Sequence, residues 1–245
     1  MSNSTRDGEE GEERVELSGS ALAALQEFYT ERDDRQKRFE ELKSAAEDRH
    51  SMAELSMDVF TEDWNASQFW YSDETATILA KQLLEGATPE TRIAVISAPS
   101  VFIQVKNLLA SDISSDAPQI FLFEIDERFE VFSEFIHYDF RSPLKLPLEL
   151  KGTFDRIICD PPFLSSDCQT KAAMTARWLS KASPTQGSQP GVRIIVCTGE
   201  RMESLVLKVY PGVRTTSFEP QHAHGRLSNE FRSYANFECD FWSWR

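Results

Sequence analysis

The chain has 245 residues, of which 40% are hydrophobic, enough to bury the core of one α/β domain with an extension. Its formal net charge of −14 argues against the broad basic face that proteins use to bind a phosphate backbone, although a basic cleft is compatible with it, and favours a basic macromolecular partner. Nucleic-acid binding is therefore not expected. The four cysteines form no CxxC pair, which argues against a metal site and fits a reducing compartment.

Residues 1–18 are polar and Glu-rich, so we expect a disordered acidic tail. This tail has no apolar core of a signal peptide, and no run in the chain approaches 18 apolar residues. We therefore expect no membrane span and a cytoplasmic location.

Residues 19–58 are expected to form an N-terminal helical extension. Leu22, Leu25, Phe28 and Tyr29 recur at three- to four-residue spacing, which predicts one long helix or two between residues 21 and 53. We interpret the extension as a lid or brace, with a partner-binding helix as the alternative.

An aromatic-rich segment follows at residues 54–71, just before a predicted helix over residues 74–85 that Ser72 or Asp73 would cap. It contains Gln68, Trp70 and Tyr71. Aromatic clusters usually belong to a core, but polar side chains are interleaved here, so a ligand wall is equally compatible.

From there the chain alternates between strand-like and helix-like runs, and residues 59–245 read as one α/β domain. Strands are predicted at 92–97, 119–125, 135–140, 154–159, 191–198, 213–219 and 231–242, with helices at 101–110, 126–132, 167–181 and 200–209. This alternation predicts an α/β fold with a mainly parallel, helix-covered sheet. The last two runs have no helix between them, so they should form an antiparallel pair at one edge.

Acidic residues stand at the ends of several predicted strands, where open α/β sheets bind ligands. They are Glu124, Asp126, Asp139 and Asp160. Glu124 could accept hydrogen bonds from both hydroxyls of a ribose, and Asp139 could accept one from an adenine amino group. Because neither GxGxxG nor GxxxxGK[ST] is present, a ligand with ribose and adenine but no phosphates fits best, and S-adenosylmethionine is such a ligand.

The strand at 154–159 leads into Asp160-Pro161-Pro162-Phe163. Each proline fixes its own φ, removes an N–H donor and keeps the preceding residue out of the helical region. The result is a stiff, extended turn with unpaired carbonyls and a fixed aromatic ring, which suits the binding of an amine. The alternative is a rigid turn with a core phenylalanine.

These segments resemble the class I S-adenosylmethionine-dependent methyltransferases, and among them the elongation factor 1-alpha lysine methyltransferases. The resemblance rests on residues 68–72 (QFWYS), 97–100 (SAPS), 121–124 (FLFE), 160–163 (DPPF) and 229–234 (NEFRSY). It implies a Rossmann-like seven-stranded sheet, mostly parallel with an antiparallel edge strand. It also implies S-adenosylmethionine as cofactor, elongation factor 1-alpha as protein substrate and, we expect, a monomer.

By this resemblance the cofactor would be held by Gln68, Trp70, Tyr71, Ser97, Ala98, Glu124, Asp126 and Asp139. Asp160, Pro161, Pro162 and Phe163 would receive the amine, and no metal is expected. One departure concerns the loop at 97–100, which lacks the glycines that most class I enzymes have there.

Two other functions are compatible with the same residues. An adenine-N6 nucleic-acid methyltransferase would deliver an exocyclic amine to the same pocket. A non-catalytic binding protein could retain the fold, and the altered loop supports that reading. His222 and His224 are interpreted as solvated or substrate-side residues and not as metal ligands.

Overall fold

The computed structural model describes residues 19–47, 55–60, 62, 68–111, 116–182, 191–223 and 230–245. The chain divides after Glu41 into two compact units. Helix α1 (Gly19–Glu47) is a single continuous helix, where the sequence allowed one or two. Its side chains Leu25, Phe28 and Tyr29 are exposed. The predicted acidic tail lies outside the described residues.

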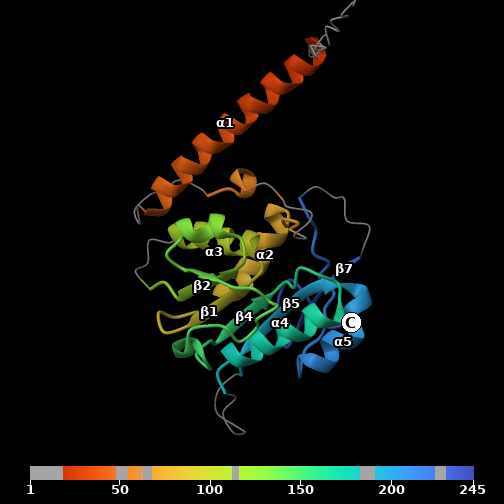
Figure 1. Cartoon of the computed structure of the whole chain (residues 1–245). Coiled ribbons are helices and arrows are strands. Elements are labelled where there is room, and N and C mark those ends of the chain that lie inside the picture. Colours follow the sequence, from red (N-terminus) through yellow and green to blue (C-terminus); the bar gives the residue numbers. More distant parts are fainter. Residues whose placement is uncertain are drawn as a thin grey trace, which may run out of the picture. The chain divides into compact units, whose positions relative to one another are not determined.

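The second unit, residues 42–245, is built on a seven-stranded sheet with the order β3-β2-β1-β4-β5-β7-β6 (Figure 1). Its strands are β1 (Arg92–Ile96), β2 (Gln119–Glu124), β3 (Phe135–His137), β4 (Arg156–Cys159), β5 (Arg193–Gly199), β6 (Arg214–Thr215) and β7 (Phe231–Ala235). Strands β1 to β5 pair in parallel, whereas β7 pairs antiparallel with both β5 and β6. The Rossmann-like, mostly parallel sheet with an antiparallel edge pair is therefore confirmed.

Helices cover both faces of this sheet. Figure 1 shows α2 (Asp73–Leu84) and α3 (Pro99–Ser111) on one face, and α4 (Ser166–Leu179) and α5 (Glu203–Val209) on the other. Helix α2 begins as predicted, because the Ser72 side chain accepts a hydrogen bond from the Thr75 backbone N–H. Short 3-10 helices occupy Met57–Val59, Glu127–Val131, Leu148–Leu150 and Glu200–Met202.

Several predicted elements are shorter than the apolar pattern suggested. The predicted helix at 126–132 is only the 3-10 turn Glu127–Val131, and β3 ends at His137 instead of Phe140. Strand β7 ends at Ala235 because the next side chain, Asn236, takes over the pairing. Its Oδ1 accepts from the Ile194 N–H at 2.8 Å and its Nδ2 donates to the Val192 carbonyl at 2.7 Å.

The core lies between the sheet and its helices. The β4 positions Ile157, Ile158 and Cys159 are fully buried, as expected for a central parallel strand covered on both faces. No helix in the described ranges is long and apolar enough to cross a membrane.

Candidate active site

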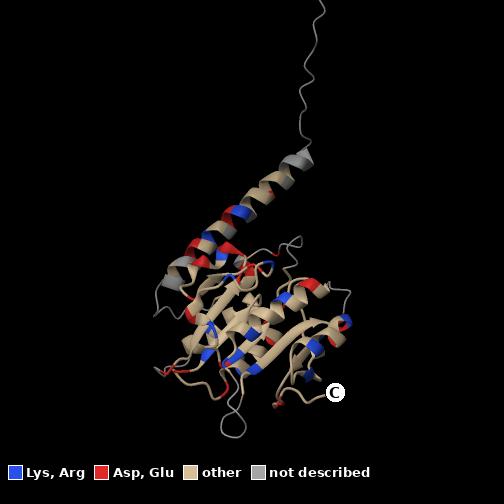
Figure 2. Cartoon of the chain, turned by 60° about the horizontal axis from the view of Figure 1, so that its bottom comes forward, with Lys and Arg blue, Asp and Glu red and all other residues tan. Residues whose placement is uncertain are grey.

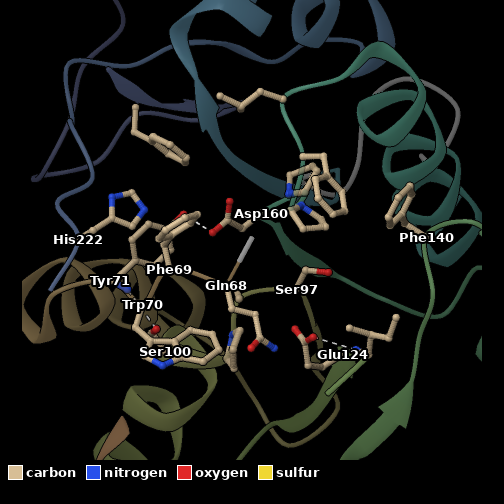
Figure 3. Close-up of a pocket in the computed structure, with 18 of the residues that line it drawn as sticks. Gln68, Phe69, Trp70, Tyr71, Ser97, Ser100, Glu124, Phe140, Asp160 and His222 are labelled. Carbon is tan, nitrogen blue, oxygen red and sulfur yellow. Dashed lines mark hydrogen bonds between the residues drawn. The ribbon is translucent and has the colours of Figure 1, made fainter. Parts of the chain in front are cut away.

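A cavity of about 680 Å³ opens where β1, β2 and β4 end (Figure 3). This volume lies in the range of small-molecule sites, and the position is the one expected for an open α/β sheet. Ten of the twelve predicted site residues line the cavity: Gln68, Trp70, Tyr71, Ser97, Ala98, Glu124, Asp160, Pro161, Pro162 and Phe163.

Ser97 ends β1 in a left-handed backbone conformation, with φ of 53°. Non-glycine residues rarely adopt this conformation. Its N–H donates to the Phe123 carbonyl at 2.9 Å, which fixes the turn, and α3 then starts at Pro99, a residue suited to the first helical turn. The loop thus makes the turn that glycine makes easily, at the cost of local strain.

Glu124 ends β2 and is buried. Its Oε1 accepts from the N–H groups of Ile125, at 2.8 Å, and Asp126, at 3.3 Å. Within the described residues no such bond reaches Oε2, and Figure 3 shows the carboxylate directed into the cavity. Burial raises the pKa of Glu124 to about 7, although the two backbone donors oppose the shift.

Asp160 follows β4, and its N–H donates to the Ile96 carbonyl at 3.0 Å, which holds the carboxylate beside the end of β1. Its Oδ2 accepts from the Tyr71 hydroxyl at 2.5 Å (Figure 3). Burial raises the pKa of Asp160 to about 7; the Tyr71 hydroxyl lowers it, and the charge of Glu124 adds to the increase. The cavity therefore holds two carboxylates that can exchange protons near neutral pH.

The two prolines carry the chain from Asp160 to Phe163, whose ring lies 5.6 Å from the ring of Phe140. Buried Gln169 on α4 fixes the end of this turn. Its Nε2 donates to the Phe163 carbonyl at 3.1 Å and to the Thr198 hydroxyl at 3.0 Å.

The aromatic segment before α2 contributes both to the core and to the lining of the cavity. Trp70 is buried, and its Nε1 donates to the Phe60 carbonyl at 2.8 Å, yet it also lines the cavity. The Tyr71 N–H donates to the Ser100 hydroxyl at 3.2 Å. This bond ties the segment to the loop after β1.

The other two predicted site residues, Asp126 and Asp139, are not among the described residues that line the cavity. Each carboxylate pairs with an arginine two residues later. Asp126 binds Arg128 at 2.5 Å and also accepts from Gln68 Nε2 at 3.1 Å, whereas Asp139 binds Arg141 at 2.7 Å. Asp126 therefore contacts the site through Gln68, while the neighbours of Asp139, Tyr138 and Phe140, face the cavity in its place.

His222 also lines the cavity and is only partly exposed. Of its two interpretations, the solvated position is wrong, whereas a substrate-side position is compatible with the cavity lining. The reason is a pairing across the chain. Tyr71 and His222 form an antiparallel bridge, the Ser72 N–H donates to the Gln221 carbonyl, and the Ala223 N–H donates to the Trp70 carbonyl, both at 2.9 Å. His224 lies outside the described residues.

Two further cavity residues, Phe69 and Phe231, lie in the segments 68–72 and 229–234 on which the resemblance rests, but they were not named as site residues. The remaining ones were not anticipated: Ile125, Tyr138, Phe140, Arg141, Leu164 and Arg201. Several of them directly follow or precede a residue that was identified, so a wider window around each strand end would have included them. Among the described residues, no cluster of three or more His, Cys, Asp or Glu side chains could hold a metal ion.

The chemistry of the cavity fits an adenosine-containing sulfonium. Glu124 has a carboxylate oxygen that could accept hydrogen bonds from ribose hydroxyls, Tyr138 and Phe140 offer flat apolar surface, and the ionised forms of Glu124 and Asp160 would attract a cation.

Comparison with known proteins agrees with this chemistry. Residues 62–239 match the family described as "Probable N6-adenine methyltransferase". The protein-lysine N-methyltransferase EFM5 of Saccharomyces cerevisiae is 46% identical over 234 residues, covering 92% of this chain and 93% of the relative. EEF1A lysine methyltransferase 1 is 39% identical in Gallus gallus, covering 91% and 93%, and 36% identical in Homo sapiens, covering 94% and 95%.

Proposed function

Because the chain belongs to this methyltransferase family, we propose that it transfers methyl groups from S-adenosylmethionine to a lysine ε-amine of translation elongation factor 1-alpha. The observation that carries the proposal is the shared cavity. The turn from Asp160 to Phe163, suited to an amine, lines the same space as Glu124, which is suited to a ribose. Relatives that align over almost the whole chain are named for this reaction.

When bound, S-adenosylmethionine supplies an electrophilic methyl group on a positively charged sulfur. Glu124 would hold the ribose, the loop from Ser97 to Ser100 and residues Gln68 to Tyr71 would surround the methionine end, and Tyr138 and Phe140 would lie beside the adenine. These assignments follow from which residues line the cavity.

The residues at the amine end have separable tasks. A lysine with an ordinary pKa near 10.4 is only about 0.1% neutral at pH 7.4, so the site must favour the uncharged amine. Asp160 would accept one N–H bond and take the proton that the ammonium loses, which its raised pKa permits. The Pro161 carbonyl would accept a second N–H, and Phe163 would face the developing cation. Correct positioning by these groups supplies much of the rate.

A second candidate is adenine-N6 methylation of a nucleic acid, which the description of the matching family favours. The charge of the molecule argues against it. The net charge is −14, and in the view of Figure 2 the Lys and Arg residues are interspersed with Asp and Glu instead of forming one basic face.

One assay distinguishes the candidates. Purified enzyme with methyl-labelled S-adenosylmethionine is offered elongation factor 1-alpha, the same factor with its lysines chemically acetylated, or adenine-containing DNA and RNA. We expect label on the unmodified factor only. Label on nucleic acid and not on the factor would support the second candidate, and label on none would support a binding protein. Cytoplasmic location and a monomeric state stay predictions, which imaging and light scattering can test.

A further inference from the structure

The amine end of the cavity has a second wall that the proposed roles leave unused. His222 lies opposite the turn from Asp160 to Phe163, and Figure 3 shows its ring directed into the same part of the cavity as Tyr71 and Asp160. The ring centroids of His222 and Tyr71 are 5.0 Å apart. The ring of Phe231, from β7, packs edge-on against His222 at 4.6 Å.

Backbone hydrogen bonds hold this wall in place. The bridge between Tyr71 and His222 is held by the bonds from Ser72 to Gln221 and from Ala223 to Trp70, and the Gln221 N–H also donates to the Thr75 hydroxyl at 3.0 Å. These bonds fix the backbone on both sides of His222. Its ring therefore has a defined position beside Tyr71, whose hydroxyl reaches Asp160.

We propose that His222 is a specificity-determining residue of the amine site, whose uncharged ring forms, with Tyr71 and Phe231, an aromatic wall facing the target amine beside Asp160. The inference rests on the proposed function. An aromatic wall attracts an ammonium or methylammonium group through the face of each ring, and it excludes water from the amine. A charged ring in this place would instead repel both the ammonium and the cofactor sulfonium.

The protonation of His222 is consistent with this role. Burial lowers its pKa to about 4, an effect that Glu62 partly opposes. The ring is therefore neutral throughout the physiological range. Besides Glu62, the described titratable groups nearest the ring are Tyr71 and Asp160, and Arg201 also lines the cavity. Tyr71 stays protonated because burial raises its pKa, and Asp160 has a pKa of about 7. Asp160, and not His222, is thus suited to take a proton from the amine near pH 7.

Three variants of the full-length enzyme test the inference. His222→Phe keeps a neutral aromatic ring, His222→Gln keeps neutrality without the ring, and His222→Lys adds a charge. We expect His222→Phe to stay within about threefold of wild type in kcat and in KM for elongation factor 1-alpha, with an unchanged pH profile. His222→Gln should raise that KM about three- to tenfold, and His222→Lys more than about tenfold. The affinity for S-adenosylmethionine, measured by calorimetry, should change least in the His222→Phe enzyme. Thermal unfolding checks that all three variants are folded.

A His222→Phe enzyme as impaired as His222→Lys would overturn the inference, and so would a His222→Lys enzyme that behaves like wild type. Loss of the acidic limb of the pH profile in His222→Phe would show that His222 is the base. A second readout does not depend on turnover. The dissociation constant of n-butylammonium, measured by NMR titration, should be unchanged in the His222→Phe enzyme and higher in the His222→Lys enzyme. The wild type and the variants could show this pattern of n-butylammonium binding while elongation factor 1-alpha stays unlabelled. In that case the proposed substrate is wrong and the role of His222 stands.

Discussion

The Tyr71 hydroxyl donates to Asp160 Oδ2 at 2.5 Å, across 89 residues of sequence. The bond joins the segment before α2 to the turn after β4, so it fixes the relative position of the two segments that form the proposed amine site. Because the donor is uncharged, it stabilises the ionised form of Asp160 without adding a positive charge near the cofactor.

We predict that Tyr71→Phe shifts the pH dependence of transfer to higher pH. The Tyr71 hydroxyl lowers the pKa of Asp160, so its removal leaves burial and Glu124 to raise that pKa further. Activity that requires the carboxylate should then appear at a higher pH, while kcat on the alkaline plateau stays within about tenfold. The measurement is kcat/KM between about pH 6 and 9.5, with Tyr29→Phe on exposed α1 as the matched control. An unchanged midpoint would refute the coupling.

Replacing Asp160 by Asn should reduce kcat by roughly 10²- to 10⁴-fold, because an amide cannot take the proton of the ammonium. Cofactor affinity should stay within a few fold, since the side chain keeps its shape and an acceptor for Tyr71. Single-turnover rates and calorimetry separate the two effects, and Asp167→Asn, on the exposed start of α4, is the control. Weakened cofactor binding with intact turnover would remove Asp160 from the amine site.

The same substitution should make stability less dependent on pH. The folded pKa of Asp160 is about 7, above the usual value of 3.8, so between these values the folded state holds a proton that the unfolded state has released. The free energy of unfolding therefore falls as pH rises from about 4 to 7. Asp160→Asn should remove this decrease and gain roughly 2–4 kcal/mol relative to wild type at pH 8. Urea unfolding at pH 5 and pH 8 measures it, and parallel pH dependences would contradict the assignment.

Glu124→Gln should weaken the binding of S-adenosylmethionine by about 10- to 100-fold, because neutral hydrogen bonds replace charge-assisted ones. In the wild type, affinity should also fall as pH drops below about 7, where the carboxyl takes up a proton. Glu149→Gln, in an exposed 3-10 turn, is the control for calorimetry. Equal affinity in the Glu124→Gln enzyme and wild type would exclude Glu124 as the ribose ligand.

Ser97→Gly should raise the free energy of unfolding by up to about 1 kcal/mol or leave it unchanged. Glycine relieves the strain at φ of 53°, but it also gains entropy in the unfolded chain. Ser97→Val should be destabilising by about 2 kcal/mol or more, because a β-branched residue tolerates this conformation poorly. Chemical denaturation of the pair tests the turn, and equal stabilities would show that it rearranges.

Gln169→Leu should lower kcat with little change in cofactor affinity. The substitution leaves the Phe163 carbonyl and the Thr198 hydroxyl without their buried donor, which costs about 1–3 kcal/mol of stability and loosens the turn. Gln104→Leu, at an exposed bond to Asp73, is the matched control. A folded Gln169→Leu enzyme with full kcat would show that Phe163 needs no such support.

The features that could be predicted best from the sequence are those that depend on the local pattern of apolar and polar residues. Glu124 and Asp160 were found because each ends an apolar strand, and parallel strands bring such ends to one edge. Asp126 and Asp139 end similar runs, yet each is followed two residues later by an arginine that pairs with its carboxylate. The repeated Asp-x-Arg spacing was the feature of the sequence that could have indicated that these two carboxylates pair with arginines and do not line the cavity.

His222 could not be placed in this way, because its position depends on a pairing with Tyr71, far earlier in the chain. No local periodicity encodes that pairing. The lengths of β6 and β7 were also overestimated. At the end of β7 the Asn236 side chain bonds to the β5 segment, a contact that a hydrophobic pattern does not reveal.

The bridge between Tyr71 and His222 has a consequence for biosynthesis. Tyr71 is synthesised before its partner segment at His222 and before β7, which contributes Phe231 and follows the five parallel strands in the chain. A nascent chain can assemble β1 to β5 and still lack one wall of its amine site. The site should therefore be complete, and activity should appear, only after β7 has paired with β5, later than the parallel part of the sheet forms.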